Sequence, residues 1–181
     1  MRIFAAAAFA GAVLGFPAAA QDWQLDANTS SVRFEATAFG NVVSGAFEDF
    51  EAEITLDPDD LSGASIEARV RTASLDGLSS SDIRQNLRGE SGLDVDGHPQ
   101  ARFVSHEITR TEAGYEAAGE LTIKGHTSEI TLPFTLEISD GRAVADGRFT
   151  IDRTTFDVGS GWGEVDEQVT VIVHIEADAA G

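Results

Sequence analysis

The stretch Gly119–Ile138 reads GELTIKGHTSEITLPFTLEI and decides the fold. Apolar side chains occupy every second position of its two arms: Leu121 and Ile123 in the first, and Ile130, Leu132, Phe134, Leu136 and Ile138 in the second. A period of two is typical of β-strands with one face in an apolar core and the other in water. The segment Lys124–Ser128 between the arms supplies a glycine and small polar residues suited to a turn. The stretch therefore predicts a β-hairpin.

The same alternation recurs along most of the chain. It predicts further strands at Trp23–Asp26, Val32–Ala38, Val43–Asp57, Ile66–Thr72, Arg102–Thr109, Ala143–Ile151 and Val169–Ile175. Phe47 and Phe50 have opposite parity in one continuous strand, so either one of them is exposed or a β-bulge lies between them, and we expect the bulge. The pair Asp82 and Gln85 resembles a capping box, which predicts one short helix over Asp82–Arg88. About eight strands with short connections are typical of an antiparallel barrel or sandwich.

The first twenty residues differ from the rest. Arg2 precedes an apolar run from Ile3 to Phe16, and Ala18–Ala20 forms a small-residue cleavage site before Gln21. The run is too short to span a bilayer, so we interpret residues 1–20 as a secretory signal peptide and residues 21–181 as one domain. We therefore expect a periplasmic or secreted protein.

Charge and cysteine content exclude several classes of function. The chain carries 31 acidic residues against 12 Lys and Arg, a net charge of −19. Such a surface repels nucleic acids, so we expect no nucleic-acid partner. The absence of cysteine excludes disulfides, thiol catalysis and thiolate metal sites.

The inward positions of the predicted strands mix many Ala and Gly residues with Phe and aliphatic ones. An eight-stranded barrel is near the size at which its interior is either just filled by side chains or holds one small ligand. An apolar space left by the small residues would suit a lipid. The alternative is a filled sandwich in which small residues face large ones, and composition alone does not separate the two.

Five segments together resemble the YceI-like family in order and spacing. They are Ser31–Phe34, Ser44–Phe50, His98–Phe103, Gly119–Phe134 and Asp152–Gly159. The resemblance spans essentially the whole chain after the leader. It implies an all-β fold: a closed, antiparallel, lipocalin-like barrel of about eight strands with one short helix. It also implies an exported protein that encloses a long isoprenoid chain. Some members are encoded beside, or fused to, cytochrome b561-like membrane proteins, which implies isoprenoid quinones as the ligands of that branch.

The resemblance and the alternation together give a set of expected lipid-binding residues. These are Phe34, Ala36, Phe39, Val43, Phe47, Phe50, Ile54, Val70, Leu75, Ile83, Leu87, Phe103, Ala117, Leu121, Ile123, Leu132, Phe134, Ala145, Phe149, Phe156 and Trp162. The chain departs from the family at Ala38 and Asn86, where many members have histidine, and at Gly92–Leu93, which replaces an aromatic pair. The short helix and the loop Gly89–Pro99 are the expected gate.

No catalytic constellation emerges from the sequence. His98, His106, His126 and His174 lack the spacing of a metal site, and no inward-facing polar dyad is present. We therefore predict a lipid carrier, not an enzyme, with no catalytic residue, no metal and no cofactor beyond the bound lipid. The expected partners are the lipid and a cytochrome b561-like membrane protein, and the chain is expected as a monomer or homodimer. Two alternatives stay open: an enzyme acting on a lipid or quinone in the same cavity, and a secreted interaction module with a filled core.

Overall fold

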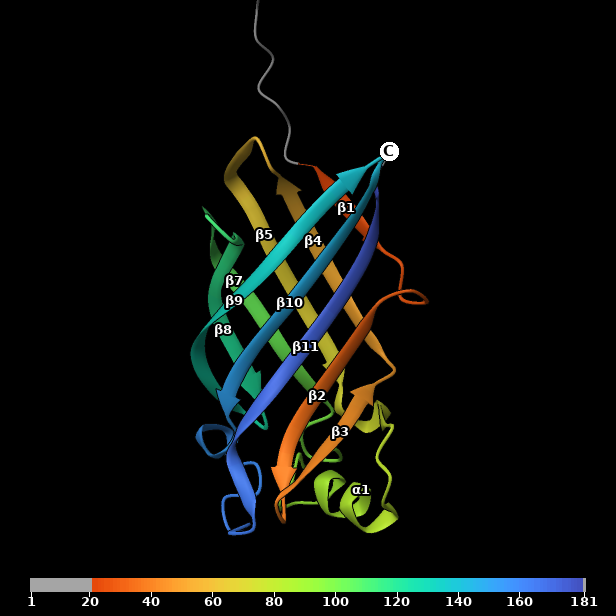
Figure 1. The fold of residues 1–181 in the computed structure, drawn as a ribbon, viewed down its shortest axis with the longest axis vertical. Coiled ribbons are helices and arrows are strands. Elements are labelled where there is room, and N and C mark those ends of the chain that lie inside the picture. The colour runs from red at the N-terminus through yellow and green to blue at the C-terminus, as the bar shows by residue number, and fades with distance from the viewer. Residues whose placement is uncertain (1–20, 181) are drawn as a thin grey trace, which may run out of the picture.

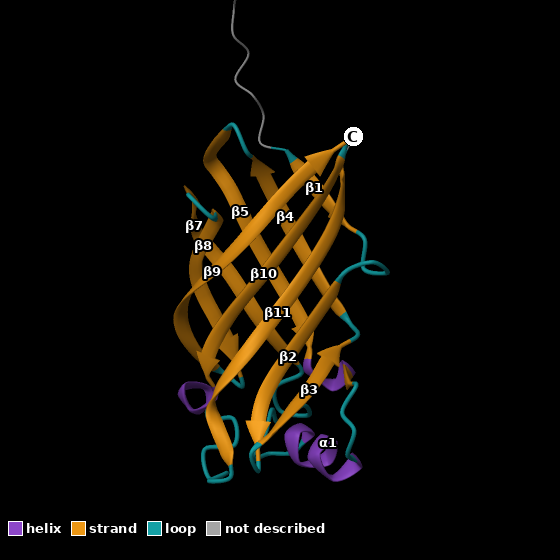
Figure 2. Ribbon diagram, in the orientation of Figure 1, coloured by secondary structure: helices purple, strands orange, loops and turns teal. Residues whose placement is uncertain are grey.

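The computed structural model describes residues 21–180, which form an elongated barrel with a single α-helix at one end (Figures 1 and 2). Its strands are β1 (Asp22–Leu25), β2 (Ser31–Ala38), β3 (Asn41–Phe47), β4 (Phe50–Asp57), β5 (Asp60–Arg71), β6 (Leu75–Asp76), β7 (Gln100–Thr111), β8 (Gly114–Ile123), β9 (His126–Ser139), β10 (Arg142–Asp152) and β11 (Val165–Ala179). The helical segments are α1 (Ser81–Arg88) and the 3₁₀ turns η1 (Thr72–Ser74) and η2 (Arg153–Phe156). The predicted signal peptide lies outside the described residues.

The barrel is closed by the first and last strands. The antiparallel order runs β1-β4-β5-β7-β8-β9-β10-β11, and β11 pairs back onto β1, so eight strands form a complete ring. Strand β11 pairs with β10 along one edge and with two strands along the other edge. On that second edge Ala177–Ala179 pair with β1, and Val165–His174 pair with β2. Strands β2, β3 and β6 thereby extend the wall at the end that carries α1 (Figure 1). The predicted closed antiparallel barrel with one short helix is confirmed.

The hairpin that organises the fold is β8–β9. Tyr115, Ala117 and Gly119 are buried, whereas Glu116 and Glu120 are exposed, as the alternation predicts. The turn is tighter than the predicted Lys124–Ser128, because Ile123 already pairs with His126. Lys124 and Gly125 alone connect the strands, with φ angles of 50° and 76°. Two consecutive left-handed residues are the geometry of a hairpin turn whose twist matches that of the strands.

The prediction of one strand from Val43 to Asp57 with a bulge was wrong. β3 ends at Phe47 and β4 begins at Phe50, so Glu48 and Asp49 form a break between two strands. The backbone N–H of Glu48 donates to Ser74 O at 3.2 Å, and Asp49 O accepts from Arg71 N at 2.9 Å. The two intervening residues let both phenylalanines point inward. Phe47 lies nearer to α1 along the barrel axis, and Phe50 lies farther from it.

The predicted helix is confirmed, but its cap is not the one expected. Ser80 is the N-cap residue, and its Oγ accepts from the backbone N–H of Ile83 at 3.4 Å. Asp82 instead lies in the first turn and Arg88 in the last. Both charges complement the helix dipole, which favours acids near the N-terminus and bases near the C-terminus. Over the described residues, no helix has the length and apolar character that a membrane span requires.

The buried core falls into two clusters stacked along the barrel. The cluster at the end opposite α1 contains Trp23, Leu56, Phe103, Ile108, Tyr115, Ala117, Phe134, Ala143 and Ala177. The indole N–H of Trp23 donates to Leu56 O at 2.9 Å, which satisfies the one polar atom of that side chain. The second cluster contains Leu93, Val95, Ile151, Phe156 and Val158, at the α1 end. Hollow space remains between and around these clusters.

Candidate ligand-binding cavities

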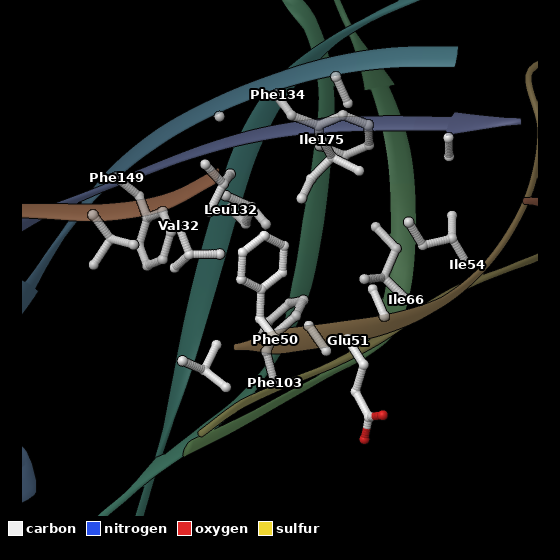
Figure 3. Close-up of a pocket in the computed structure, with 18 of the residues that line it drawn as sticks. Val32, Phe50, Glu51, Ile54, Ile66, Phe103, Leu132, Phe134, Phe149 and Ile175 are labelled. Atoms are coloured by element: carbon white, nitrogen blue, oxygen red, sulfur yellow. The ribbon is translucent and has the colours of Figure 1, made fainter. Parts of the chain in front are cut away.

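An upper cavity of about 190 Å³ lies inside the closed part of the barrel (Figure 3). Strands β4, β5, β7, β8, β9, β10 and β11 all contribute side chains to it. Phe50, Phe103 and Phe134 project into this space from three of these strands (Figure 3). A space of this kind, walled by hydrocarbon, favours an apolar occupant over water.

Two charged residues, Glu51 and Arg102, line the upper cavity, but their charged groups lie outside it. The carboxylate of Glu51 points away from the neighbouring side chains (Figure 3), and its Oε1 lies 3.6 Å from Arg69 Nη1. Arg102 Nε lies 2.9 Å from Glu67 Oε1. The charged heads of Glu51 and Arg102 are therefore engaged on the outer surface, and the inner surface is apolar. Trp23 and Leu56, both buried, line the part of the cavity that lies far from α1.

A lower cavity of about 370 Å³ lies at the α1 end. Its walls come from β2, β3, α1, the segment around η2 and the start of β11. Phe39 lines it while 71% exposed, and Asn86, Gly163 and Glu164 line it from exposed positions. These residues place the mouth of the cavity between the β2–β3 turn, α1 and the loop before β11.

The two cavities adjoin at Val171, which lines both. Near this level the rings of Phe34 and Phe47 lie 5.8 Å apart, centroid to centroid. Glycines make room here: a Cβ on Gly45 would lie 2.6 Å from the Phe34 ring, and one on Gly147 would lie 2.8 Å from Val173 Cγ2. The interior thus holds two adjoining cavities with mainly apolar walls, and Val171 lies between them.

The structure brings nineteen of the twenty-one expected site residues to these cavities. Those at the upper cavity are Phe50, Ile54, Val70, Phe103, Leu121, Leu132, Phe134, Ala145 and Phe149. Those at the lower cavity are Phe34, Ala36, Phe39, Val43, Phe47, Ile83, Leu87, Ile123, Phe156 and Trp162.

Leu75 and Ala117 line neither cavity. Leu75 is 4% exposed and pairs with Phe47 through the short strand β6. Ala117 is fully buried and faces Ile108 and Leu132 on its neighbouring strands. Both pack within the wall and reach no open space.

The sequence reasoning missed part of the lining. Val32, Ile66, Val173, Ile175 and Ala177 line the upper cavity, and the alternation of their strands is the signal that finds them. Arg153, in the lower cavity, gave no such signal, because it lies in η2 just after β10 ends. A buried arginine is the less expected finding.

Arg153 is 6% exposed and clamps the loop before β11. Its Nε donates to Asp166 O at 2.9 Å. Its Nη1 donates to Val158 O at 2.8 Å and to Gly159 O. Its Nη2 donates to Trp162 O at 3.1 Å and to Val165 O at 2.7 Å. A guanidinium has five N–H groups, and all five are used. The loop from Val158 to Asp166 is therefore held along its length by one side chain.

The residue before Arg153 is an ionised aspartate. Hydrogen bonds from Thr154 lower the pKa of the neighbouring Asp152 carboxyl, and the charge of Arg153 adds to this effect. Asp152 is thus held as an anion beside the guanidinium. Trp162 covers the other side, with its ring centroid 5.9 Å from Arg153 Cζ.

The expected gate loop is anchored. Within residues 89–99, Leu93 and Val95 are buried in the lower core cluster, and Ser91 O accepts from Gly159 N at 2.7 Å. Helix α1 has no buried residue, although Ile83 and Leu87 line the cavity. The loosely packed part of the rim is α1, and the loop after it is fixed to the clamped side.

The histidines lie away from both cavities. His106 Nε2 lies 3.0 Å from Glu129 Oε2, and His174 Nδ1 lies 2.8 Å from Asp146 Oδ1, both pairs on the outside of the barrel. Within residues 21–180, no three acidic or histidine side chains are grouped to hold a metal ion.

Residues 23–177 match the YceI-like domain. The chain belongs to the YceI-like domain family. Among curated relatives of the family, the chain is 30% identical to a UPF0312 protein of Serratia proteamaculans over 139 residues, which is 73% of this chain and 71% of that protein. A UPF0312 protein of Pectobacterium carotovorum is 29% identical over the same shares of the two chains.

Solved structures with the same fold are also similar to this chain. BcnA of Burkholderia cenocepacia superposes with a TM-score of 0.79 at 29% identity, covering 85% of this chain and 99% of BcnA. A polyisoprenoid binding domain from Saccharophagus degradans superposes with a TM-score of 0.67 at 13% identity, covering 87% and 98%. At that identity the second match shows the fold alone.

Proposed function

We propose that this protein is a carrier that holds one isoprenoid or isoprenoid-quinone lipid inside its barrel. The observation that carries the proposal is the pair of adjoining apolar cavities, about 190 and 370 Å³, in the interior of a closed barrel. Membership of the YceI-like family supports it, as does the shared fold with a polyisoprenoid binding domain.

The physical basis is the burial of hydrocarbon. Each Å² of apolar ligand surface removed from water contributes about 25 cal/mol to binding. A long isoprenoid tail has little solubility of its own, so a barrel that encloses it keeps the lipid in solution. No bond is made or broken in such a cycle of uptake and release.

The arrangement of the cavities gives the ligand a direction. Buried Trp23 and Leu56 line the upper cavity far from α1, and the exposed lining residues of the lower cavity place the mouth at the α1 end. The tail would therefore enter first and pass Val171 into the upper cavity, and the polar end of the lipid would stay in the lower one. Because α1 packs loosely while the opposite rim is clamped by Arg153, α1 is the element that opens.

The two alternative functions fit the structure less well. An enzyme would need polar groups placed to act on the ligand. The upper cavity presents hydrocarbon, and in the lower cavity the guanidinium of Arg153 is taken up by backbone carbonyls. An interaction module with a filled core would leave no hollow interior. The cavities argue for carriage over both.

Mass spectrometry of an organic extract from the purified protein tests the proposal. We expect a lipid with a polyprenyl chain at about one molecule per chain. Delipidated protein should also take up decylubiquinone, followed by quenching of Trp23 and Trp162, which line the two cavities. An empty protein that takes up neither decylubiquinone nor geranylgeraniol would refute the proposal.

We further propose that the chain is exported by cleavage after residue 20 and works in the periplasm or outside the cell, as a monomer or homodimer. A cytochrome b561-like membrane protein is the proposed exchange partner for a quinone. Amino-terminal sequencing of protein recovered from a periplasmic extract tests the export, and a mature chain that keeps residues 1–20 in the cytoplasm would contradict it.

A further inference from the structure

The polar end of a bound lipid can meet polar side chains only at the lower mouth. The lower cavity is lined by Asn86, Arg153 and Glu164 among otherwise apolar residues and Trp162. The charged groups beside the upper cavity are engaged outside it. The chemistry of the lower mouth therefore decides which polar ends are accepted.

Arg153 is the cation that lines this cavity, and it has nothing left to donate. Its five N–H groups are bound to five backbone carbonyls. A phosphate placed at the mouth would need charge-assisted hydrogen bonds to replace its hydration. Arg153 can supply them only by releasing the loop that it holds.

The other basic residues at this end are also engaged. Arg84 Nη2 lies 3.2 Å from Asp76 Oδ1 and 3.1 Å from Leu78 O. Arg88 donates to Ala73 O, and Lys124 Nζ donates to Asp157 O at 2.8 Å. The Nε–H of Arg84 is buried without a partner, but Arg84 does not line the cavity. Glu164, in contrast, is an exposed acidic residue that lines the cavity.

The remaining polar groups at the mouth are neutral. The amide of Asn86 can donate and accept, and the indole N–H of Trp162 can donate. A ketone, quinone or hydroxyl oxygen matches these groups without a charge to compensate. We propose that the lower mouth selects lipids with an uncharged polar end and rejects the phosphorylated forms of the same chain. This inference rests on the proposed lipid-carrier function.

The test compares two ligands that share a tail. Geranylgeraniol and geranylgeranyl diphosphate are titrated into delipidated protein, with tryptophan quenching as the readout. We expect the alcohol to bind at least about tenfold more tightly, and the difference to shrink as salt screens the repulsion. Equal affinities, or tighter binding of the diphosphate, overturn the inference and leave the carrier function standing. If neither ligand binds, the carrier function itself fails.

A pair of charge variants locates the effect. Glu164→Lys removes the carboxylate from the mouth. It should lower the ratio of the affinity for geranylgeraniol to the affinity for geranylgeranyl diphosphate severalfold. Glu167→Lys makes the same change in net charge at a nearby exposed residue, which lines neither cavity. This variant should lower the ratio of the two affinities much less. If both variants change the ratio equally, the discrimination comes from the net charge of the protein, and the assignment to the lower mouth is wrong.

Discussion

Replacing Ala145 by Trp gives the sharpest test of a hollow interior. Ala145 lies on β10, pairs with Leu136 and Ile175, and lines the upper cavity together with both. A larger side chain there would grow into open space and occupy the volume that a lipid tail would fill. The variant should therefore lose ligand without losing its fold.

The magnitudes follow from the cavity. An aromatic side chain buries roughly 150–250 Å², which at about 25 cal/mol per Å² is about 4–6 kcal/mol of burial denied to the tail. Ligand affinity should fall by roughly a thousandfold or more. Filling about half of the 190 Å³ cavity should at the same time stabilise the delipidated protein by about 2 kcal/mol, at ~24 cal/mol per Å³.

The assay pairs decylubiquinone titration with urea unfolding of delipidated protein. Val144→Trp is the matched control, because Val144 is the next residue on β10 and faces the other side of the sheet. It should leave affinity nearly unchanged. Ala117→Trp should instead destabilise the fold, because Ala117 is fully buried in the wall and borders no cavity. If Ala145→Trp binds the quinone as the wild type does, the upper cavity is not where the tail lies.

Three further outcomes are expected. Val171→Phe narrows the junction between the cavities, so the lipids recovered by extraction should shift to shorter chains, and an unchanged length distribution would mean that the tail does not cross this point. Arg153→Met leaves five backbone carbonyls without their donor and should lower the free energy of unfolding by at least about 3 kcal/mol in urea titrations, and a loss below about 1 kcal/mol would show that the clamp is not structural. Hydrogen bonds to Asp146 and Glu176 raise the pKa of His174 above its ordinary value of 6.5, so its contribution to stability is fully present below pH 6.5 and is lost as the pH rises through the raised pKa. Wild type should therefore exceed His174→Gln in stability at about pH 5.5 and lose that margin by about pH 9, and a margin independent of pH would contradict the assignment.

The alternation of side chains predicted an antiparallel barrel or sandwich, because each strand has one face in the interior and one in water, and the resemblance to the YceI-like family favoured the closed barrel. It also predicted which residues face inward, and most of those line a cavity. It could not separate Ala117 from Ala145, since both are small residues on inward positions. The difference between them is what lies opposite: Ala117 meets the packed wall at Ile108 and Leu132, whereas Ala145 borders open volume.

The remaining errors arise where local pattern is ambiguous. A change of parity between Phe47 and Phe50 fits a bulge as well as a break between strands. The break forms because Glu48 and Asp49 hydrogen-bond to Ser74 and Arg71, which lie in a distant segment. The partners of Arg153 are main-chain carbonyls, which every residue carries, so no sequence motif marks them. Such a site becomes visible only when the loop is folded around it.

The two ends of the described chain come together at one pole of the barrel. Asp22 O accepts from Ala180 N at 2.9 Å, and this pole is the one opposite α1 (Figure 1). A fluorophore, an affinity handle or a whole fused protein attached at either end is therefore carried behind the barrel, with the entrance facing outward. Chains anchored to a surface through either terminus keep their openings directed at the surrounding solution, which makes immobilised protein suitable for testing the proposed lipid uptake directly.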